Sequence, residues 1–504
     1  MNESKERKNG AILSYISIAT NMIVQLLYTP VLIRMLGQSE YGLYSLTSSI
    51  ISYLTVLDLG FGNAIIVYTA KYRAKKEYEE EKKMHGMFFL IFCIMGLIAT
   101  ILGLIIFFNI TTLFGRTMSK LELDKMKIMM LILTFNLAVT FPFSIFGSII
   151  SAYERFTYKK IIAIASTVLK PLIMLPLLFC GCKSITLSIV VTIVNIIMLL
   201  SNYFYCREKL DIKIKFTGFN KKIFKTIFGY SFFIFLGVCA DRINWSVDNF
   251  ILGAVLGTTT VSIYSVASTF NQFFINISTA ISGVFLPKIS KMVAKNTPKE
   301  EITNEFIKIG RLQYIIVFLM ASGFVLFGKQ FILYWVGEEF EESYYVALLL
   351  IIPLCIPLIQ NLGISIMQAM NKHKFRTAAM FIMAIFNAVI SLFLARAYGI
   401  IGVAAGTAIS LIIVNVIAIN IYYYRVIKID IPRFWKEIIK MTIPFMLSIV
   451  FFIMITRMIK IKGFIGLIIY IAVYIIIYAI VAYFLTMNDY ERNLTKSFLI
   501  KWRK

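Results

Sequence analysis

A short stretch of the chain, residues 228–255, places charged and aromatic side chains inside an otherwise apolar run. It carries Asp241, Arg242, Trp245 and Asp248. On a helix, Asp241, Trp245 and Asp248 share one face, because they are spaced four and three apart, and Arg242 lies beside them. A guanidinium donates to phosphate in pairs and an indole gives sugar rings a stacking surface, so this face suits a phosphorylated sugar. An Arg242–aspartate ion pair that only holds helices together is the alternative.

Two further ionisable residues lie inside apolar runs, where such groups cost roughly 2.5–3.5 kcal/mol each on insertion. Lys170, followed by Pro171, is a second candidate contact for an anion, although a lysine can also snorkel or deprotonate. Asp58 stands in LDLGFGNA, where Gly60 and Gly62 can interrupt a helix. We expect Asp58 either to accept a proton or cation during a transport cycle or to cap the broken helix.

Uncharged polar residues add hydrogen-bonding capacity in later runs, and helix packing explains many of them. Asn271 and Gln272 are the candidates that we assign to ligand binding. The others in this class are Asn276, Gln360, Asn361 and Gln368. A separate stripe of small residues, Gly402, Gly406 and Ser410, predicts close helix packing.

The elements that must position these residues follow from composition. The chain has 504 residues, of which 59% are hydrophobic and 15% charged, with a mean hydropathy of +0.81. Soluble proteins are about 45–50% apolar and 25% charged, so a water-soluble fold is excluded. We therefore expect an all-α polytopic membrane protein with fourteen transmembrane helices. The predicted spans are 10–33, 41–69, 86–109, 126–151, 160–180, 184–206, 228–255, 259–287, 309–328, 343–369, 377–396, 400–424, 436–457 and 463–486.

The net charge of +25 indicates orientation rather than nucleic-acid binding. If the N-terminus is inside, 38 of the 51 Lys and Arg residues fall on the inner side. Because positive loops resist translocation, we expect both termini to be cytoplasmic in a multi-pass protein of the plasma membrane, with the basic loops facing anionic lipids. Basic residues near the ends of spans are counted with the adjoining loops, and Lys170 and Arg242 are the two that this scheme leaves within spans.

Several kinds of chemistry are excluded. The two histidines, His85 and His373, stand in short basic loops and are expected to be solvated, so no metal site or histidine triad is predicted. The six cysteines lack metal-ligand spacing, and we expect neither a disulfide framework nor a cofactor. No gap between spans has room for a nucleotide-binding domain. The phosphate-loop-like string GFVLFGKQ ends at Gln330, which lacks the hydroxyl that binds magnesium.

The chain also contains an internal repeat. LGQSEYGLYSLTSSI (36–50) aligns without a gap on LGTTTVSIYSVASTF (256–270). The offset of six helices preserves orientation, which predicts two parallel bundles, 1–215 and 216–428, with two additional helices and a cytoplasmic tail in 429–504. The repeat places Asn21 and Gln25 opposite Asp241 and Trp245.

Five strings together resemble the bacterial polysaccharide flippases, the oligosaccharide-lipid branch of the multidrug/oligosaccharidyl-lipid/polysaccharide exporter superfamily. They are LGQSEYGLYSL, LDLGFGNAIIVYTAKY, DNFILGAVLGTTTVSIYSVA, WVGEEFEESYYVALLL and AYGIIGVAAGTAIS. The resemblance implies two six-helix bundles around a central cavity and a polyprenyl-pyrophosphate-linked oligosaccharide as substrate. Many relatives carry an arginine in the second-span motif, where this chain has VYTAKY, so anion binding would rest on Arg242 and Lys170.

The resulting hypothesis is a flippase rather than an enzyme, working by alternating access for surface polysaccharide synthesis. Trp245 and the amides would hold the sugars, and Asp58, Asp241 or Asp248 would couple transport to an ion gradient. Polysaccharide polymerase or glycosyltransferases would be pathway partners. The alternatives are a cation-coupled drug antiporter, a peptidoglycan-precursor flippase and, with Glu338–Glu342 as its carboxylates, a membrane glycosyltransferase or polymerase.

Overall fold

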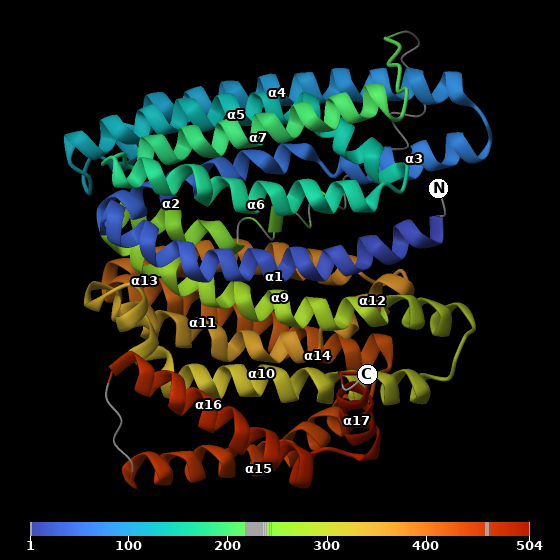
Figure 1. Cartoon of the computed structure of the whole chain (residues 1–504), viewed down its shortest axis with the longest axis vertical. Helices are drawn as coiled ribbons and strands as arrows, with labels where there is room; N and C mark the ends of the chain where they lie inside the picture. The colour runs from blue at the N-terminus through green and yellow to red at the C-terminus, as the bar shows by residue number, and fades with distance from the viewer. Residues whose placement is uncertain are drawn as a thin grey trace. The chain divides into compact units, whose positions relative to one another are not determined.

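The apolar runs form long α-helices in the computed structural model, which describes residues 3–216, 235, 237, 239–240, 242, 244–458 and 463–502 (Figure 1). Over this part of the chain, twelve helical stretches are long and apolar enough to cross a membrane. One of them, Lys374–Ile427, covers two predicted spans, and the predicted span 228–255 lies partly outside the described residues. The predicted all-α polytopic fold is confirmed.

Contacts divide the chain into two compact units. Unit 1 comprises Met1–Ser265 and Met380–Gly406, and unit 2 comprises Val266–Ala379 and Thr407–Lys504. These units follow contacts between residues, whereas the bundles 1–215 and 216–428 and the appended segment 429–504 follow a sequence repeat. The division into bundles therefore stays a prediction.

Unit 1 is built from long helices, of which α4, α5 and α7 run side by side while α1 packs against α6 (Figure 1). Leu32 and Leu36 of α1, with Met174 and Leu178 of α6, belong to one buried apolar cluster. The elements are α1 (Glu3–Leu36), α2 (Gln38–Leu54), η1 (Thr55–Asp58), α3 (Phe61–Ala74), α4 (Tyr78–Phe114), α5 (Lys120–Ala152), α6 (Phe156–Phe179) and α7 (Ser184–Glu208), and α9 (Thr258–Ala294) and α13 (Lys374–Leu411) begin or continue here.

The predicted second span is broken, as LDLGFGNA indicated. It consists of α2, the single 3₁₀ turn η1, and α3. Leu59 (φ 51°) and Gly60 (φ 71°) adopt the left-handed conformation between the pieces, which glycine enters without the cost that a Cβ imposes. Gly60 therefore interrupts the helix, whereas Gly62 lies inside α3.

The small-residue stripe packs closely, as predicted. The chain turns at Gly399 (φ 59°), inside α13. A Cβ at Gly402 would stand 2.1 Å from the Leu394 carbonyl oxygen, and one at Gly406 would stand 2.5 Å from Ser391 Oγ. The two arms of this hairpin therefore approach at a distance that only glycine permits.

In unit 2, α15 and α16 pack against α10. Phe327 of α10 joins Phe445 and Phe452 of α15 and Tyr474 of α16 in one buried aromatic cluster. The Tyr474 hydroxyl donates to Ser322 Oγ at 2.6 Å, so this contact is also polar. The elements of unit 2 are α10 (Lys299–Trp335), η2 (Glu338–Phe340), α11 (Glu342–Ile359), α12 (Leu362–Ala369), η3 (Ile412–Ala418), α14 (Ile419–Tyr422), η4 (Tyr423–Ile427), α15 (Ile431–Met458), α16 (Gly463–Val481), η5 (Ala482–Thr486) and α17 (Asp489–Trp502).

Candidate functional site

The helical segment 244–255 of the predicted seventh span lies against α2 through a polar seam. Ser246 Oγ is 3.0 Å from Ser52 Oγ, and Asn249 Nδ2 donates to Ser49 Oγ at 2.8 Å. On each helix the two residues are three positions apart, so they share a face. Hydrogen bonds, rather than apolar contact alone, join the two helices.

Asp248 lies on the buried side of this segment. It is 2% exposed, and one carboxylate oxygen accepts a hydrogen bond from the Tyr264 hydroxyl of α9. Burying a carboxylate is costly unless hydrogen bonds compensate for the lost water. Asp248 therefore joins helices of unit 1 in this conformation, and exposing it requires the Tyr264 contact to open.

The other residues of the predicted face differ from Asp248 in exposure. Trp245 is 40% exposed and Arg242 is exposed, whereas Asp241 lies outside the described residues. Trp245 and Asp248 therefore do not share one environment, although helical spacing predicts that they share one face. Arg242 and Trp245 are the exposed members of the predicted set among the described residues.

Lys170 and the polar residues of α1 also belong to unit 1. Lys170 is partly buried on α6, directly before Pro171. On α1, Asn21 is exposed and Gln25 is partly buried, and their spacing of four places them on one face. Because α1 packs against α6, these residues belong to one helix pair.

Glu122 forms hydrogen bonds to both copies of the sequence repeat. Its carboxylate accepts hydrogen bonds from Ser39 Oγ at 2.6 Å and from Thr258 Oγ1 at 2.7 Å. Ser39 and Thr258 follow the aligned glycines Gly37 (φ 85°) and Gly257 (φ 93°), which share a left-handed backbone conformation. The loops that match in sequence therefore match in backbone conformation at these glycines.

Glu122 also completes a capping box at the start of α5. The Ser119 backbone N–H donates to Glu122 Oε2 at 2.8 Å, and the Glu122 N–H donates to Ser119 Oγ. The motif S-x-x-E is a recognised helix start. This motif could have predicted from the sequence that Glu122 has a structural role at the start of a helix.

Asp58 ends the turn η1 at the broken helix. Its side chain is partly buried and accepts a hydrogen bond from the backbone of Gly60. This contact favours the capping role among the two that the sequence left open. Ion coupling by Asp58 stays a prediction.

Asn271 and Gln272 lie on α9, within unit 2. Asn271 is 2% exposed, and its amide atoms have no hydrogen-bond partner in the part of the chain described. Gln272 is exposed and donates to Asn276 Oδ1 at 2.9 Å. Of the two, Gln272 is accessible to a ligand in this conformation.

Other predicted polar residues form hydrogen bonds at a second helix break, which lies between α11 and α12. Asn361 Nδ2 donates to Ser278 Oγ at 2.9 Å, and that hydroxyl donates to the Leu358 carbonyl at 2.8 Å. Gln360 exchanges hydrogen bonds with Asn420 at 2.8 and 3.2 Å. Gln360 and Asn361 therefore serve helix packing.

The prediction of a solvated histidine is wrong for His85. Helix α4 begins at Tyr78, so His85 lies within it and is 1% exposed, with Nε2 2.9 Å from Thr69 Oγ1 of α3. The basic residues around His85 suggested a loop, but they occupy a helix end. His373 directly precedes α13 and is partly exposed.

Close to His85 in sequence, a buried carboxylate is held by an aromatic residue. Glu81 is 4% exposed and accepts a hydrogen bond from Tyr153 at 2.9 Å, while the Arg73 guanidinium stacks 3.5 Å from the Tyr153 ring centre. Burial, and then the Glu81 charge, raise the pKa of Tyr153. The phenol is therefore protonated and donates to Glu81.

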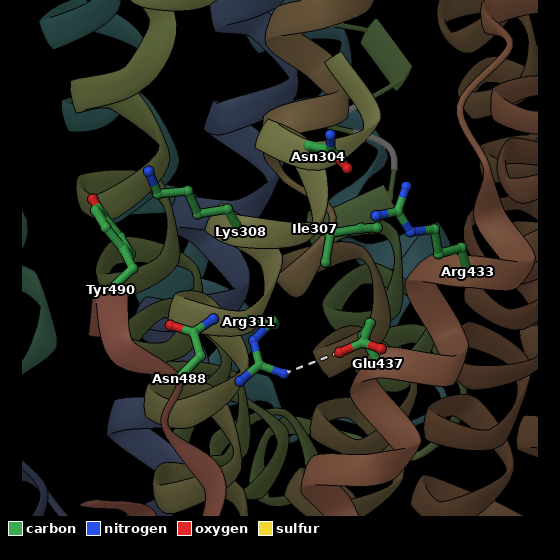
Figure 2. A pocket seen from close by; sticks show the side chains of 8 residues that line it. All are labelled: Asn304, Ile307, Lys308, Arg311, Arg433, Glu437, Asn488 and Tyr490. Atoms are coloured by element: carbon green, nitrogen blue, oxygen red, sulfur yellow. Dashed lines mark hydrogen bonds and ion pairs between the residues drawn. The ribbon is translucent and has the colours of Figure 1, made fainter. Parts of the chain in front are cut away.

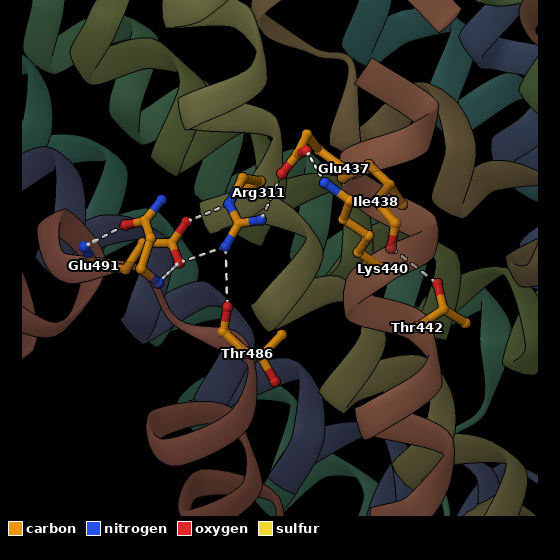
Figure 3. Close-up of polar contacts among 8 residues, drawn as sticks. Arg311, Glu437, Ile438, Lys440, Thr442, Thr486 and Glu491 are labelled. Carbon is orange, nitrogen blue, oxygen red and sulfur yellow. Dashed lines mark hydrogen bonds and ion pairs between the residues drawn. The ribbon is translucent and has the colours of Figure 1, made fainter. Parts of the chain in front are cut away.

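In unit 2, Arg311 is the centre of an ion network that the sequence did not reveal (Figure 3). It is 7% exposed and donates to both carboxylate oxygens of Glu491, at 2.8 and 2.9 Å. It also donates to the Thr486 carbonyl at 3.0 Å and to Glu437 at 3.4 Å. An arginine two residues inside the apolar run 309–328 was the available signal.

The comparison with known families decides the affiliation. Residues 7–293, more than half of the chain, match the family model described as polysaccharide biosynthesis protein. The chain belongs to this family. The resemblance inferred from the five sequence strings is thereby confirmed.

One relative of this polysaccharide biosynthesis protein is a Shigella flexneri protein described as an O-antigen transporter. The two are 22% identical over 391 residues, which are 76% of this chain and 89% of the relative. The match spans most of both chains.

Solved structures share the fold. Lipid II flippase MurJ in an inward closed conformation aligns with a TM-score of 0.71 and 18% identity, over 94% of this chain and 97% of MurJ. An inward-facing multidrug resistance MATE family transporter of the MOP superfamily aligns with a TM-score of 0.63 and 14% identity, over 79% of this chain and 96% of the transporter. The chain therefore shares the fold of these two proteins.

Proposed function

We propose that the protein is a flippase that moves polyprenyl-pyrophosphate-linked oligosaccharide repeat units across the bacterial plasma membrane for surface polysaccharide synthesis. A pyrophosphate with several sugars cannot cross hydrocarbon unaided, because each polar group would lose its hydrogen bonds to water. A protein that offers polar groups by alternating access lowers this barrier while the polyprenyl chain stays in lipid.

The observation that supports this function most is the family match over residues 7–293. The O-antigen transporter relative and the shared fold with the lipid II flippase agree with it, since both printed names concern a polysaccharide or its lipid-linked precursor. Transport of a head group requires no covalent step, so the protein acts as a transporter and not as an enzyme.

The accessible side chains of unit 1 suit the head group. Arg242 is exposed and, with Lys170, would hold the pyrophosphate, because both cations donate to phosphate oxygens. Trp245 would stack on a sugar, and Asn21 and Gln25 would bond its hydroxyls. Asn271 and Gln272 belong to unit 2, and their role in ligand binding stays a prediction from the sequence.

Asp248 suits ion coupling rather than sugar contact. Asp248 is buried against Tyr264, and protonation of the carboxylate would weaken this charge-assisted hydrogen bond. Asp58 stands at the helix break, and Asp241 completes the set of candidate coupling residues. A proton or sodium gradient acting on these carboxylates would drive the cycle.

The charge pattern supports cytoplasmic termini, with the basic loops on the side where the lipid-linked substrate is made. The polysaccharide polymerase and glycosyltransferases of the same pathway would be its partners.

Complementation tests the proposal. A bacterial strain that lacks its own repeat-unit flippase accumulates the lipid-linked intermediate, and expression of this chain is expected to restore surface polysaccharide for at least one substrate glycan. Loss of restoration for every glycan tested, in cells with normal membrane levels of the protein, would contradict the proposal.

Drug export is the second candidate, because the MATE transporter shares the fold. A cation antiporter would use acidic groups and would not depend on Arg242. Efflux of cationic dyes from cells expressing the chain, unchanged in Arg242→Ala, would favour it.

Restored synthesis of peptidoglycan in cells depleted of their lipid II flippase would favour the precursor-flippase alternative.

A further inference from the structure

Unit 2 contains a cavity of about 460 Å³ between α10, α15 and the beginning of α17 (Figure 2). Side chains from the three helices surround the opening, with Lys308 and Tyr490 on one side and Arg433 on the other. The volume lies in the range of small-molecule sites. The lining residues are Asn304, Ile307, Lys308, Arg311, Arg433, Glu437, Asn488 and Tyr490.

The walls of this cavity carry excess positive charge. The Arg311 charge is matched by Glu491 and Glu437, which both lie within ion-pair distance. Lys308 and Arg433 have no carboxylate within that distance among the described residues, and the Lys308 ammonium lies 3.5 Å from the Tyr490 ring centre. The three lining cations therefore outnumber the carboxylates Glu437 and Glu491, and the cavity keeps a net positive charge.

Neutral hydrogen-bonding groups complete the lining. Asn304 and Asn488 are exposed amides, and Tyr490 is 40% exposed with its hydroxyl at the opening. These groups can bond hydroxyl or ester oxygens beside an anionic centre. Such a set is typical of a phosphorylated polyol rather than of a bare ion.

The cavity lies at the level where lipid head groups are expected. Lys308 directly precedes the apolar run 309–328, and Arg433 stands three residues before the run 436–457. Both runs start on the side that the charge pattern predicts to be cytoplasmic. Basic pockets at this depth bind the head groups of anionic lipids.

We propose that this cavity binds a glycerol-phosphate group through Lys308 and Arg433, and that an anionic phospholipid of the inner leaflet supplies it. The guanidinium and the ammonium bind the phosphate oxygens, and the amides and the tyrosine bind the glycerol. Because the Arg311–Glu491 pair fixes the start of α17 beside the cavity, an occupied site stabilises unit 2.

The test uses the full chain, purified and placed in phosphatidylcholine nanodiscs with increasing fractions of phosphatidylglycerol. The unfolding midpoint reports binding, because a ligand of the folded state raises it. The test variant is Lys308→Gln with Arg433→Gln. The control variant, Arg425→Gln with Lys436→Gln, removes the same charge from exposed residues that do not line the cavity.

We expect phosphatidylglycerol to raise the midpoint of the wild type and the control at the same lipid fraction. In the test variant, the fraction of phosphatidylglycerol that gives half of the full rise in the unfolding midpoint should be at least fivefold higher than in the wild type. An equal response in the test and control variants would overturn the proposal. If the double variant unfolds in phosphatidylcholine alone, Arg433→Gln is compared with Lys436→Gln, and an equal response in those two overturns it.

A second arm separates a lipid from a soluble source. Glycerol 1-phosphate is titrated against the protein in neutral detergent. If glycerol 1-phosphate raises the unfolding midpoint of the wild type and the control but not of the test variant, that result would keep the glycerol-phosphate site and assign it to a soluble phosphate ester. Stabilisation by phosphatidylglycerol alone, with the same loss in the test variant, assigns the site to a membrane lipid.

Discussion

Arg242 is exposed on the described half of the predicted seventh span, where the proposed function gives it the pyrophosphate. We expect Arg242→Ala to lower the rate of head-group translocation about tenfold, which corresponds to about 1.4 kcal/mol, the strength of one charge-assisted hydrogen bond. Arg396→Ala, also exposed, is the matched control and should leave the rate unchanged. If Arg242→Ala translocates the head group at the wild-type rate at equal protein levels, Arg242 does not bind the pyrophosphate.

Tyr264 satisfies the buried carboxylate of Asp248. Tyr264→Phe removes only the hydroxyl, so we expect the free energy of unfolding to fall by about 1–3 kcal/mol. Tyr424→Phe, at a residue that is 54% exposed, is the control and should change it by less than about 0.5 kcal/mol. Chemical unfolding in detergent measures both, and equal stability of the two variants would show that the Asp248 contact is not maintained.

Residue spacing grouped the candidate residues but did not predict their exposure. The helical period placed Trp245 and Asp248 on one face, yet Trp245 is exposed and Asp248 is buried. Residues three apart differ by about 60° around a helix, so the edge of a packed interface can fall between them. The sequence also missed Arg311, because its partner Glu491 is 180 positions away.

At the scale of elements, the contact of α2 with the start of α9 depends on a glycine. A Cβ at Gly42 would stand 1.9 Å from the Thr258 carbonyl oxygen, which is backbone and cannot rotate away. We expect Gly42→Ala to destabilise unit 1 by at least about 2 kcal/mol, through overpacking. Gly283→Ala is the control, because nothing lies within 4 Å of its Cβ position. Similar unfolding midpoints for the two variants would contradict the observed packing.

The Arg311–Glu491 ion pair joins α10 to the first turn of α17. Glu491 has a fully buried side chain, so Arg311→Gln leaves its charge without an ion-pair partner, which costs about 3–5 kcal/mol. We expect protease cleavage near residue 488 to become faster. Lys440→Gln removes only an exposed pair with Glu437 and should have little effect. Cleavage at the wild-type rate in Arg311→Gln would show that another contact holds α17.

Helix positions followed from apolar runs, and the break at Gly60 followed from a glycine-rich motif. The break between α11 and α12 could not be predicted, because Gln360 and Asn361 carry no strong local signal. Their hydrogen-bond partners are side chains that lie far away in the sequence. Helix α4 extends to Tyr78, well before its apolar run at residue 86, because charged residues can continue a helix into water. Hydropathy marks the hydrocarbon part of a helix and not its end.

For the whole molecule, composition predicted a polytopic membrane protein, and the repeat predicted paired bundles. The twelve apolar helices of the described residues agree with the first expectation, and the division into bundles stays a prediction. Composition could not identify the transported molecule, since a drug exporter and a lipid flippase need the same apolar helices. That distinction depends on a few polar residues, and Arg242 and Lys170 are the ones to which we propose this role.

Translocation by the purified full chain tests the central claim most directly. Proteoliposomes would carry a polyprenyl-pyrophosphate oligosaccharide, and a membrane-impermeant enzyme that modifies its terminal sugar would report which leaflet holds the head group. We predict that the protein moves the head group to the opposite leaflet much faster than protein-free liposomes do, and that a phospholipid with a similar head-group volume stays in place. Equal rates with and without the protein, for repeat units of several glycans and with an imposed proton or sodium gradient, would contradict the account.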